Sequence, residues 1–275
     1  MHGTTKSNIK PSILEIFSQG VLAEDALCYD TIICAVPLLC RQGLNDFFVS
    51  VNRHLIERGR FECRFEQAKA EILGRLCYCG FEIVKESQTD SLCSVVAQKN
   101  KHVEQAPELH YGRFICLKRI GQWGKEMNVV KLRTMYPYAE FLQDYMCKNY
   151  RLQDGGKINN DFRITPCGRV LRKYWIDEIP MIGLLLMGKI KLVGVRPLSP
   201  SFFGLYSEKL QQKRTQFKPG LFPPFYADLP QTLDEIEASE WNYLQQCEKN
   251  GVFVTDFIYF WKIIYNIVFR KARSA

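Results

Sequence analysis

The chain has 275 residues, of which 47% are hydrophobic and 24% are charged. These ordinary globular values exclude a disordered or fibrous chain and allow one large domain or two small ones. The longest apolar runs fall short of the ~18–20 residues of a spanning helix, so we expect no transmembrane protein. The start, Met1 to Lys6, lacks a charged and then apolar signal segment, so we expect the chain to stay in the cytoplasm.

The net charge of +8 is concentrated in the middle of the chain. Residues 112–220 carry 20 Lys and Arg against 8 Asp and Glu, a local net charge of +12, whereas residues 1–111 and 221–275 each carry −2. A local positive field predicts an anionic partner, such as nucleic acid, a phosphate-bearing small molecule or anionic lipid. A solvated basic surface is the alternative, but the setting of these cations among apolar strands and Gly turns favours a site.

The eleven cysteines do not form the pattern of a disulfide scaffold or a zinc site. Their number is odd, the chain is long for a disulfide-rich fold, and no Cys-x-x-Cys is present. Cys77 and Cys79 have no nearby His to complete a usual zinc pattern. We therefore expect reduced and mostly buried thiols.

The first hundred residues alternate predicted strands and helices. Apolar runs predict strands over residues 31–36, 81–84 and 92–97. Helical spacing predicts helices over residues 44–56, ended by Arg58-Gly59, and over residues 66–79, ended by Gly80. Residues 99–110 are polar, contain Pro107 and read as a linker. This places the boundary between two domains, 1–105 and 106–275.

The second half begins with strands over residues 114–117 and 127–132 around a Gly turn at 121–124. Residues 136–150 are predicted to be helical, and Gly155-Gly156 breaks the chain. Two short helices are predicted over residues 168–173 and 177–187, and a strand over residues 190–193.

Residues 27–99 resemble the carboxyl-terminal half of a class I S-adenosylmethionine methyltransferase. The resemblance rests on the segments 29–33, 51–55 before Gly59, and 76–84. The cofactor-binding half is missing, because no Gly-rich turn follows a first strand. We therefore expect a truncated Rossmann-like module, a remnant or a docking module whose role is unknown, and no working methyltransferase.

The stretch from Arg169 to Pro180 contains two adjacent carboxylates, Asp177 and Glu178, after three basic residues. Neighbouring side chains on a helix point about a quarter-turn apart, so one carboxylate can face a substrate while the other holds a metal. The simpler alternative is that acidic residues in a first helical turn stabilise the helix through its dipole. Pro180 is acceptable in either case, because a first turn has no amide bond to lose.

The surroundings of the two carboxylates resemble the bacterial sugar transferase family, the monotopic polyprenyl-phosphate phosphoglycosyl transferases. The resemblance covers residues 111–270, and the order of its six blocks makes it specific. These blocks are the Gly turn 121–124, Lys131-Leu132-Arg133-Thr134-Met135, Asn160 to Thr165 with Gly168, Arg172 with Asp177-Glu178-Ile179-Pro180, Leu192 to Pro197, and Lys218-Pro219-Gly220. The implied fold class is α/β (α+β), a small mixed-sheet domain with interfacial helices.

The resemblance implies that a nucleotide diphosphate sugar, a UDP-sugar, gives its sugar-1-phosphate to undecaprenyl phosphate, which initiates exopolysaccharide, capsule or other glycan synthesis. It implies that Asp177 is the nucleophile of a covalent phospho-aspartyl intermediate and that Asp177 and Glu178 hold Mg²⁺. The alternative is a catalytically inactive scaffold in a polysaccharide assembly complex, motivated by the departures from the family pattern described below.

Cations have to screen a carboxylate that approaches a phosphate. Arg172 and Arg196 are the main phosphate-binding candidates, because a guanidinium fork matches phosphate oxygens. A strand lysine can instead extend to solvent, and an arginine can pair with a neighbouring carboxylate such as Asp161. With this alternative open, the further candidates are Lys131, Arg133 and Arg163.

The chain departs from the family pattern in two ways that bear on the membrane and the metal. Residues 1–110 lack the family's re-entrant apolar helix, since the segment 32–39 with Pro37 is too short. Lys189 stands where the family has an acidic residue, which makes the site more basic and can change contacts to the metal or the leaving group.

A lipid phosphate substrate requires contact with a bilayer. Residues 253–269 predict an aromatic helix followed by a basic tail at 270–273, either an interfacial anchor or a core-packed helix, and residues 221–226 are a candidate aromatic wedge. We expect a peripheral or monotopic protein on the cytoplasmic face of the inner membrane. Nucleic acid is not expected as a partner, because the aromatics of the basic segment do not interleave with Lys and Arg. Self-association into a homo-oligomer is left open.

Overall fold

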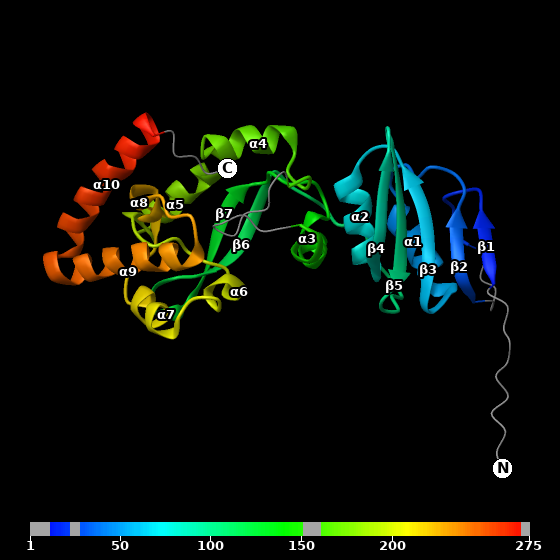
Figure 1. The fold of residues 1–275 in the computed structure, drawn as a ribbon, viewed down its shortest axis with the longest axis horizontal. Coiled ribbons are helices and arrows are strands. Elements are labelled where there is room, and N and C mark those ends of the chain that lie inside the picture. Colours follow the sequence, from blue (N-terminus) through cyan, green and yellow to red (C-terminus); the bar gives the residue numbers. More distant parts are fainter. Residues whose placement is uncertain (1–11, 23–27, 151–160, 271–275) are drawn as a thin grey trace, which may run out of the picture. The chain divides into compact units, whose positions relative to one another are not determined.

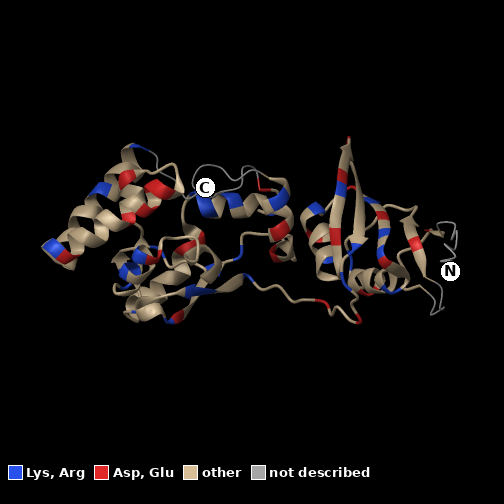
Figure 2. Ribbon diagram, turned by 60° about the horizontal axis from the view of Figure 1, so that its bottom comes forward, with Lys and Arg blue, Asp and Glu red and all other residues tan. Residues whose placement is uncertain are grey.

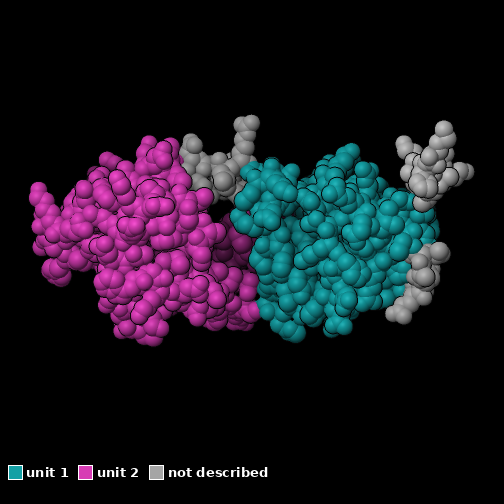
Figure 3. All heavy atoms as spheres, turned by 90° about the horizontal axis from the view of Figure 1, so that it is seen from below, with its two compact units in different colours: residues 1–111, 136–150 teal, residues 112–135, 151–275 magenta. Residues whose placement is uncertain are grey.

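The computed structural model describes residues 12–22, 28–150 and 161–270. The chain forms two compact units, Met1–Tyr111 with Tyr136–Tyr150 and Gly112–Met135 with Arg151–Ala275, coloured separately in Figure 3. This division differs from the expected single boundary after residue 105, because residues 136–150 pack within the first unit. The expected break at Gly155-Gly156 lies outside the described residues.

The first unit is built on a five-stranded sheet with the strand order β1-β2-β3-β5-β4 (Figure 1). Strands β1, β2 and β3 are parallel, and β5 is antiparallel to both β3 and β4. The elements of this unit are β1 Ile13–Ile16, β2 Tyr29–Cys34, α1 Leu44–Arg53, β3 Leu55–Phe65, α2 Lys69–Tyr78, β4 Phe81–Thr89, β5 Leu92–Lys99, a 3-10 turn η2 Ala139–Leu142 and α3 Gln143–Asn149.

The two faces of this sheet differ in polarity. Ile32, Phe61 and Ala97 pair across neighbouring strands and are buried. Phe47 and Phe48 of α1 pack on Phe61 with ring centroids 6.0 Å away. The neighbouring row on the opposite face is polar and consists of Thr31, Arg60, Gln98 and Glu82. Parallel strands joined by helices that cover one face match the expected Rossmann-like module.

One predicted helix is too long, and the strand that follows it, β3, was missed, as were the short strands β1 and β9. The helix predicted over residues 44–56 ends at Arg53, and β3 begins at Leu55. Leu55 continues the helical spacing of the preceding apolar residues, which hid the change to a strand. The alternation of buried Phe61, Cys63 and Phe65 with outward polar residues has the period of two that marks a strand. The second helix begins at Lys69, three residues later than predicted.

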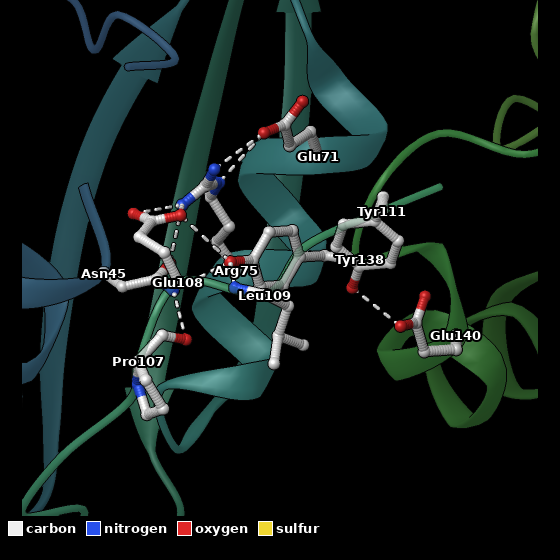
Figure 4. Close-up of polar contacts among 9 residues, drawn as sticks. All are labelled: Asn45, Glu71, Arg75, Pro107, Glu108, Leu109, Tyr111, Tyr138 and Glu140. Carbon is white, nitrogen blue, oxygen red and sulfur yellow. Dashed lines mark hydrogen bonds and ion pairs between the residues drawn. The ribbon is translucent and has the colours of Figure 1, made fainter. Parts of the chain in front are cut away.

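A buried polar network holds the segment after Pro107 and the segment around Tyr138 to the helices of the first unit (Figure 4). Arg75 of α2 forms an ion pair of 2.7 Å with Glu108 and donates to Asn45 at 2.8 Å. The guanidinium lies 4.4 Å from the ring centroid of Tyr138. The Tyr138 hydroxyl accepts from Asn45 and from the Leu109 amide and donates to Glu108. The predicted linker is therefore anchored at this point.

We predict that Tyr138→Phe destabilises the first unit by about 2 kcal/mol, because the buried Asn45 amide, the half-buried Leu109 amide and a Glu108 oxygen all lose the Tyr138 hydroxyl. Tyr111→Phe is the matched control, since it removes a hydroxyl that donates to Glu140 at the surface, and it should cost below about 1 kcal/mol. Urea unfolding of the full chain, followed by amide exchange in peptides of α1 and α2, measures both. Equal effects of the two substitutions would contradict this account of the network.

The second unit contains two separate two-stranded sheets in place of one mixed sheet. Strands β6 Phe114–Ile120 and β7 Glu126–Leu132 are antiparallel around the 3-10 turn η1 Gln122–Gly124, and β8 Lys191–Val193 is parallel to β9 Gly220–Phe222. The helical elements are α4 Pro166–Lys173, a 3-10 segment η3 Ile176–Met181, α5 Ile182–Leu186, α6 Pro200–Phe203, α7 Glu208–Thr215, α8 Phe225–Asp228, α9 Leu233–Asn250 and α10 Val252–Phe269. The mixed α/β fold class with small sheets is confirmed.

Helix α10 packs one face and exposes an apolar one. Thr255, Tyr259, Ile263 and Asn266 are buried, and Asn266 donates to two backbone carbonyls of α8. The outer face of α10 is apolar and solvent-exposed, and it carries Phe253, Val254, Phe257, Trp261, Tyr265, Val268 and Phe269. Both interpretations of this helix therefore hold in part. One face packs in the core of the second unit, and the other face is exposed. The basic residues 271–273 lie outside the described residues.

One helix qualifies by length and composition where no spanning segment was expected, and the candidate aromatic wedge is wrong. Among the described residues, α10 alone is long and apolar enough to cross a membrane, with a mean hydropathy of 1.5. Asp256 and Lys262 interrupt its apolar run, which is why the sequence showed no such segment. The expected aromatic wedge at 221–226 is not exposed, because Tyr226 is buried and Leu221, Phe222 and Phe225 pack against hydrophobic clusters of the second unit.

The cysteines form no disulfide, as expected, but fewer than half of them are buried, so the expectation of mostly buried thiols is wrong. All eleven are free, and five of them are buried. Burial raises the pKa of Cys79 to about 12, which keeps this thiol protonated and unreactive near neutral pH. Among the described residues, no cluster of His, Cys, Asp and Glu is composed like a zinc site.

Candidate active site

Strand β7 and segment η3 bring the basic and acidic candidates together. Met181 and Leu184 pack with Val129 of β7 in a small hydrophobic cluster, which fixes η3 against this strand. Lys131 follows Val129 by two residues and therefore points to the same side of the strand. Its ammonium nitrogen lies 2.5 Å from Oε1 of Glu178.

Helix α4 is fastened to the end of β7 by backbone contacts. The Thr165 hydroxyl caps the helix by accepting from the Gly168 amide at 2.9 Å, and the Thr165 amide donates to the Thr134 carbonyl at 2.9 Å. The last turn of α4 is basic, as Figure 2 shows. From this turn, Nε of Arg172 donates to the Thr134 hydroxyl at 2.8 Å. Arg172 is thus fixed beside the Lys131 motif.

A strained residue makes the turn between α4 and η3. Trp175 has a φ of 56°, which is unfavourable for a residue with a side chain by roughly 1 kcal/mol. Its indole donates to the Tyr226 hydroxyl at 3.2 Å and packs edge-on to that ring. Packing against Tyr226 therefore stabilises the strained backbone of Trp175. The tight turn at Trp175 brings Asp177 close to Arg172.

Glu178 is a buried carboxylate held by two cations. Oε1 lies 2.5 Å from the Lys131 ammonium and accepts from Nη2 of Arg196 at 2.8 Å. Burial alone would raise the pKa of Glu178, but Arg196 and Lys131 outweigh it and lower the pKa. Burial and the nearby Arg196 also lower the pKa of Lys131, against the opposing effect of Glu178. Glu178 therefore stays ionised.

Asp177 has the opposite environment. The residue is 8% exposed, and its Oδ1 is a buried oxygen that no described residue hydrogen-bonds. Burial raises its pKa, and Glu178 adds to this, while Lys131 and Arg172 act against it. Two neighbouring carboxylates whose pKa values are pushed apart are typical of a reactive site. Because the charge of Asp177 is poorly stabilised in the free protein, its oxygen is the better nucleophile of the two.

The loop that carries Arg196 is fixed by a close approach of two glycines. The Gly220 amide donates to the Val195 carbonyl at 2.9 Å, and the Gly194 amide donates to the Phe222 carbonyl at 3.1 Å. A Cβ on Gly220 would lie 2.1 Å from the Gly194 nitrogen, so only glycine fits. Two sequence blocks that are distant in the chain, 192–197 and 218–220, are therefore one structural feature.

The remaining candidates lie differently from the expectation. Arg163 forms a buried ion pair of 2.7 Å with Asp161, the alternative considered for it. Arg133 donates to the Gly112 carbonyl at 3.0 Å. Lys189 is exposed, and among the described residues it makes no ion pair with Asp177 or Glu178. The structure thus brings together Asp177, Glu178, Lys131, Arg172 and Arg196 and does not bring Arg133, Arg163 or Lys189 to the two carboxylates.

Two residues near the site were missed in the sequence. Thr134 anchors Arg172, and its place inside the Lys131–Met135 block was the available signal. Arg119 of β6 is half-buried and forms no ion pair with a described carboxylate, and burial and Arg196 lower its pKa. A basic residue at the end of a strand, just before a Gly turn, was the signal for Arg119.

The Asp177 carboxylate, and not the expected pair with Glu178, fits a Mg²⁺ ion whose remaining ligands are water and substrate phosphates. Mg²⁺ is usually bound through one or two carboxylates together with water and substrate phosphates. The orphaned Oδ1 of Asp177 fits one such ligand, whereas Oε1 of Glu178 is already taken by cations. Among the described residues, no group of three or more His, Cys, Asp and Glu can hold a metal alone.

The family model of the bacterial sugar transferases matches residues 108–270. Because this match covers more than half of the chain, the protein belongs to the bacterial sugar transferase family. The sequence is 36% identical over 103 residues to the uncharacterized sugar transferase EpsL of Bacillus subtilis, covering 38% of this chain and 45% of that protein. It is 33% identical over 109 residues to the UDP-glucose:undecaprenyl-phosphate glucose-1-phosphate transferase of Caulobacter vibrioides, covering 38% and 36%. The chain thus spans less than half the length of these relatives.

A solved structure is also similar to part of this chain. It is a Thermus thermophilus 16S rRNA N2 G1207 methyltransferase in complex with AdoMet and guanosine, which is 14% identical and covers 40% of this chain and 29% of its own. The TM-score of 0.24 is too low for this likeness to carry an argument about fold or activity.

Proposed function

We propose that the protein transfers a sugar-1-phosphate from a UDP-sugar to undecaprenyl phosphate and so starts the synthesis of a polysaccharide. The observation that carries this proposal is the buried, unpartnered Oδ1 of Asp177 beside Lys131 and Arg172. Membership of the sugar transferase family supports the reaction class. The activity for which the Caulobacter relative is named, UDP-glucose:undecaprenyl-phosphate glucose-1-phosphate transfer, supports these substrates.

The chemistry proceeds in two displacements at one phosphorus. A carboxylate oxygen of Asp177 attacks the phosphorus next to the sugar, its bond to the bridging oxygen breaks, and UMP leaves. The sugar phosphate is then held as an acyl-phosphate on Asp177. A phosphate oxygen of undecaprenyl phosphate attacks the same phosphorus, which releases undecaprenyl diphosphate sugar and restores the carboxylate. Two steps replace one direct encounter of two highly charged phosphates.

The cations around the carboxylates provide the electrostatic stabilisation that this reaction needs. In this proposal the guanidinium groups of Arg172 and Arg196 bind phosphate oxygens of the substrate. The Lys131 ammonium, which contacts Glu178, offsets the negative charges of that carboxylate and of the substrate. Glu178 aligns Lys131 and Arg196 through its shared oxygen. When bound at Asp177, Mg²⁺ would neutralise charge on the diphosphate.

We place the protein on the cytoplasmic face of the membrane, with α10 lying in the interface. An amphipathic helix whose outward face is aromatic and apolar is suited to the boundary between lipid headgroups and acyl chains. Phe253 and Phe269, at the two ends of α10, are 83% and 70% exposed, so the apolar surface runs along the whole helix. Four buried residues hold the opposite face to the second unit, which favours an interfacial over a spanning position.

We predict that Trp261→Ser weakens binding to vesicles of phosphatidylethanolamine and phosphatidylglycerol by roughly tenfold, because the exposed indole no longer enters the interface. Trp123→Ser is the matched control, since Trp123 is also exposed but lies in the β6–β7 turn, and it should leave binding unchanged. Vesicle sedimentation of the full chain measures both. Equal loss in both variants, or no loss in either, would rule out α10 as the membrane contact.

The direct test is release of UMP by the full chain from UDP-glucose, UDP-galactose, UDP-N-acetylglucosamine or UDP-N-acetylgalactosamine, with undecaprenyl phosphate and Mg²⁺. We expect one or more of these donors to release UMP. We expect catalytic turnover only when the lipid phosphate is present. Failure of all four UDP-sugars would contradict the proposal and favour the inactive scaffold. Copurification of other glycan-assembly proteins with an inactive chain would support that alternative.

A further inference from the structure

Helices α7 and α9 meet in a buried ion pair near the Arg196 loop. Nε of Arg214 lies 2.8 Å from Oε2 of Glu240, and the two residues are 5% and 0% exposed. The rings of Tyr206 and Phe203 lie 4.9 Å and 5.9 Å from the guanidinium carbon. The desolvation cost of a buried ion pair offsets most or all of its attraction, so stability alone does not account for this pair.

The other arm of Arg214 reaches the loop that carries a candidate phosphate ligand. Nη2 of Arg214 donates to the backbone carbonyl of Arg196 at 2.6 Å. The side chain of Arg196 in turn donates to Glu178 at 2.8 Å. A continuous chain of contacts therefore runs from the buried carboxylate of Glu240 to Glu178, the neighbour of Asp177. Among the contacts of the described residues, neither Arg214 nor Glu240 forms a hydrogen bond or ion pair with Asp177 or Glu178.

We infer that Arg214 and Glu240 are positioning residues that fix the Arg196 loop so that its guanidinium can bind the sugar diphosphate. This inference rests on the proposed function. The Gly220 amide holds the loop at the Val195 carbonyl, and Arg214 holds it at the next carbonyl, so the backbone is clamped on both sides. Glu240 keeps the Arg214 fork from turning away, since its carboxyl oxygen lies directly against Nε.

The same two helices contain a natural control. Lys213 and Glu248 join α7 and α9 through a second ion pair of 2.7 Å at the surface. This pair has the same helices and the same kind of charges, but among the contacts of the described residues it makes none with the Arg196 loop. An effect that follows only from joining α7 to α9 should therefore be shared by Glu248→Gln and Glu240→Gln.

The experiment compares Arg214→Lys, Glu240→Gln and Glu248→Gln in the full chain, with each of the four UDP-sugars and undecaprenyl phosphate. We expect Arg214→Lys and Glu240→Gln to lower kcat/KM by tenfold or more, mainly through a higher KM for the donor. Glu248→Gln should leave kcat/KM within twofold of the wild type. In an Arg196→Ala background, Arg214→Lys should cause little further loss, because Arg214 acts through Arg196.

Amide exchange in the peptide that spans residues 194–198 provides a readout that does not need activity. We expect faster exchange there in Arg214→Lys and Glu240→Gln and unchanged exchange in Glu248→Gln. If no UDP-sugar is turned over by the wild type, the proposed function fails. The exchange pattern still tests whether Arg214 and Glu240 fix the Arg196 loop. Equal exchange in all three variants, or a full additional loss in the Arg196→Ala background, would overturn the inference.

Discussion

Asp177→Asn is expected to abolish UMP release, with a fall in kcat of at least about a thousandfold, because an amide cannot form the acyl-phosphate. The change keeps the size of the side chain, so Arg172, Lys131 and Glu178 can keep their places. With the donor labelled in its sugar and no lipid phosphate added, the wild type should acquire a covalent label and the variant none. Near-normal turnover by the variant would remove Asp177 as the nucleophile.

The same substitution should leave the protein as stable as the wild type or more so. Oδ1 of Asp177 has no hydrogen-bond partner among the described residues, and burial raises the pKa of this carboxyl, so its charge is unfavourable in the fold. A carboxyl with a raised pKa binds protons more tightly in the folded state, so its contribution to stability is present at low pH. That contribution is lost as the pH rises through the folded pKa.

Asp177→Asn should therefore flatten the pH dependence of the melting temperature in the acidic range. Asp161→Asn is the control for stability, because it removes the buried carboxylate that pairs with Arg163 and should cost about 3 kcal/mol. Thermal unfolding of both variants between acidic and neutral pH separates the two cases. A loss of stability in Asp177→Asn as large as in Asp161→Asn would show that Asp177 has a structural role.

The candidates that the structure brings together lie in short ordered blocks of the sequence. Asp177, Arg172 and Arg196 each lie within a short sequence motif, and the structure brings the three side chains together. The clamp of Arg214 and Glu240 has no such linear signal, because it forms where two helices pack. The one trace in the sequence is a carboxylate on the stripe of α9 that also carries Tyr243, Leu244 and Cys247.

The fold could be predicted where local patterns are strong and not where assembly decides. Within the helix predicted over residues 136–150, residues 139–149 are helical, but helical spacing does not reveal which surface the helix covers. Their place in the first unit depends on Gly74, where a Cβ would lie 2.3 Å from the Tyr138 carbonyl oxygen. Strand β3 was missed because Leu55 fits both the helical spacing of the residues before it and the two-residue alternation of the strand that begins there.

The second large effect is expected for Gly168→Ala. A Cβ at this position would lie 2.1 Å from the Thr134 carbonyl oxygen and 2.8 Å from the Thr165 hydroxyl. Helix propensity favours alanine over glycine by about 1 kcal/mol, but the clash is with backbone and has to be relieved by moving α4. Because Arg172 is fixed to Thr134 from this helix, the movement displaces the guanidinium. We expect kcat/KM to fall by about a hundredfold and stability by about 2 kcal/mol.

Gly183→Ala is the matched control, because Gly183 lies in α5 of the same unit and a Cβ there would meet nothing within 4 Å. This substitution should leave UMP release unchanged and raise stability by up to about 1 kcal/mol through helix propensity. The contrast distinguishes a close approach of α4 to β7 from a general sensitivity of the unit to added methyl groups. If Gly168→Ala kept full activity, α4 would not depend on this approach, and the placement of Arg172 beside Asp177 would need another cause.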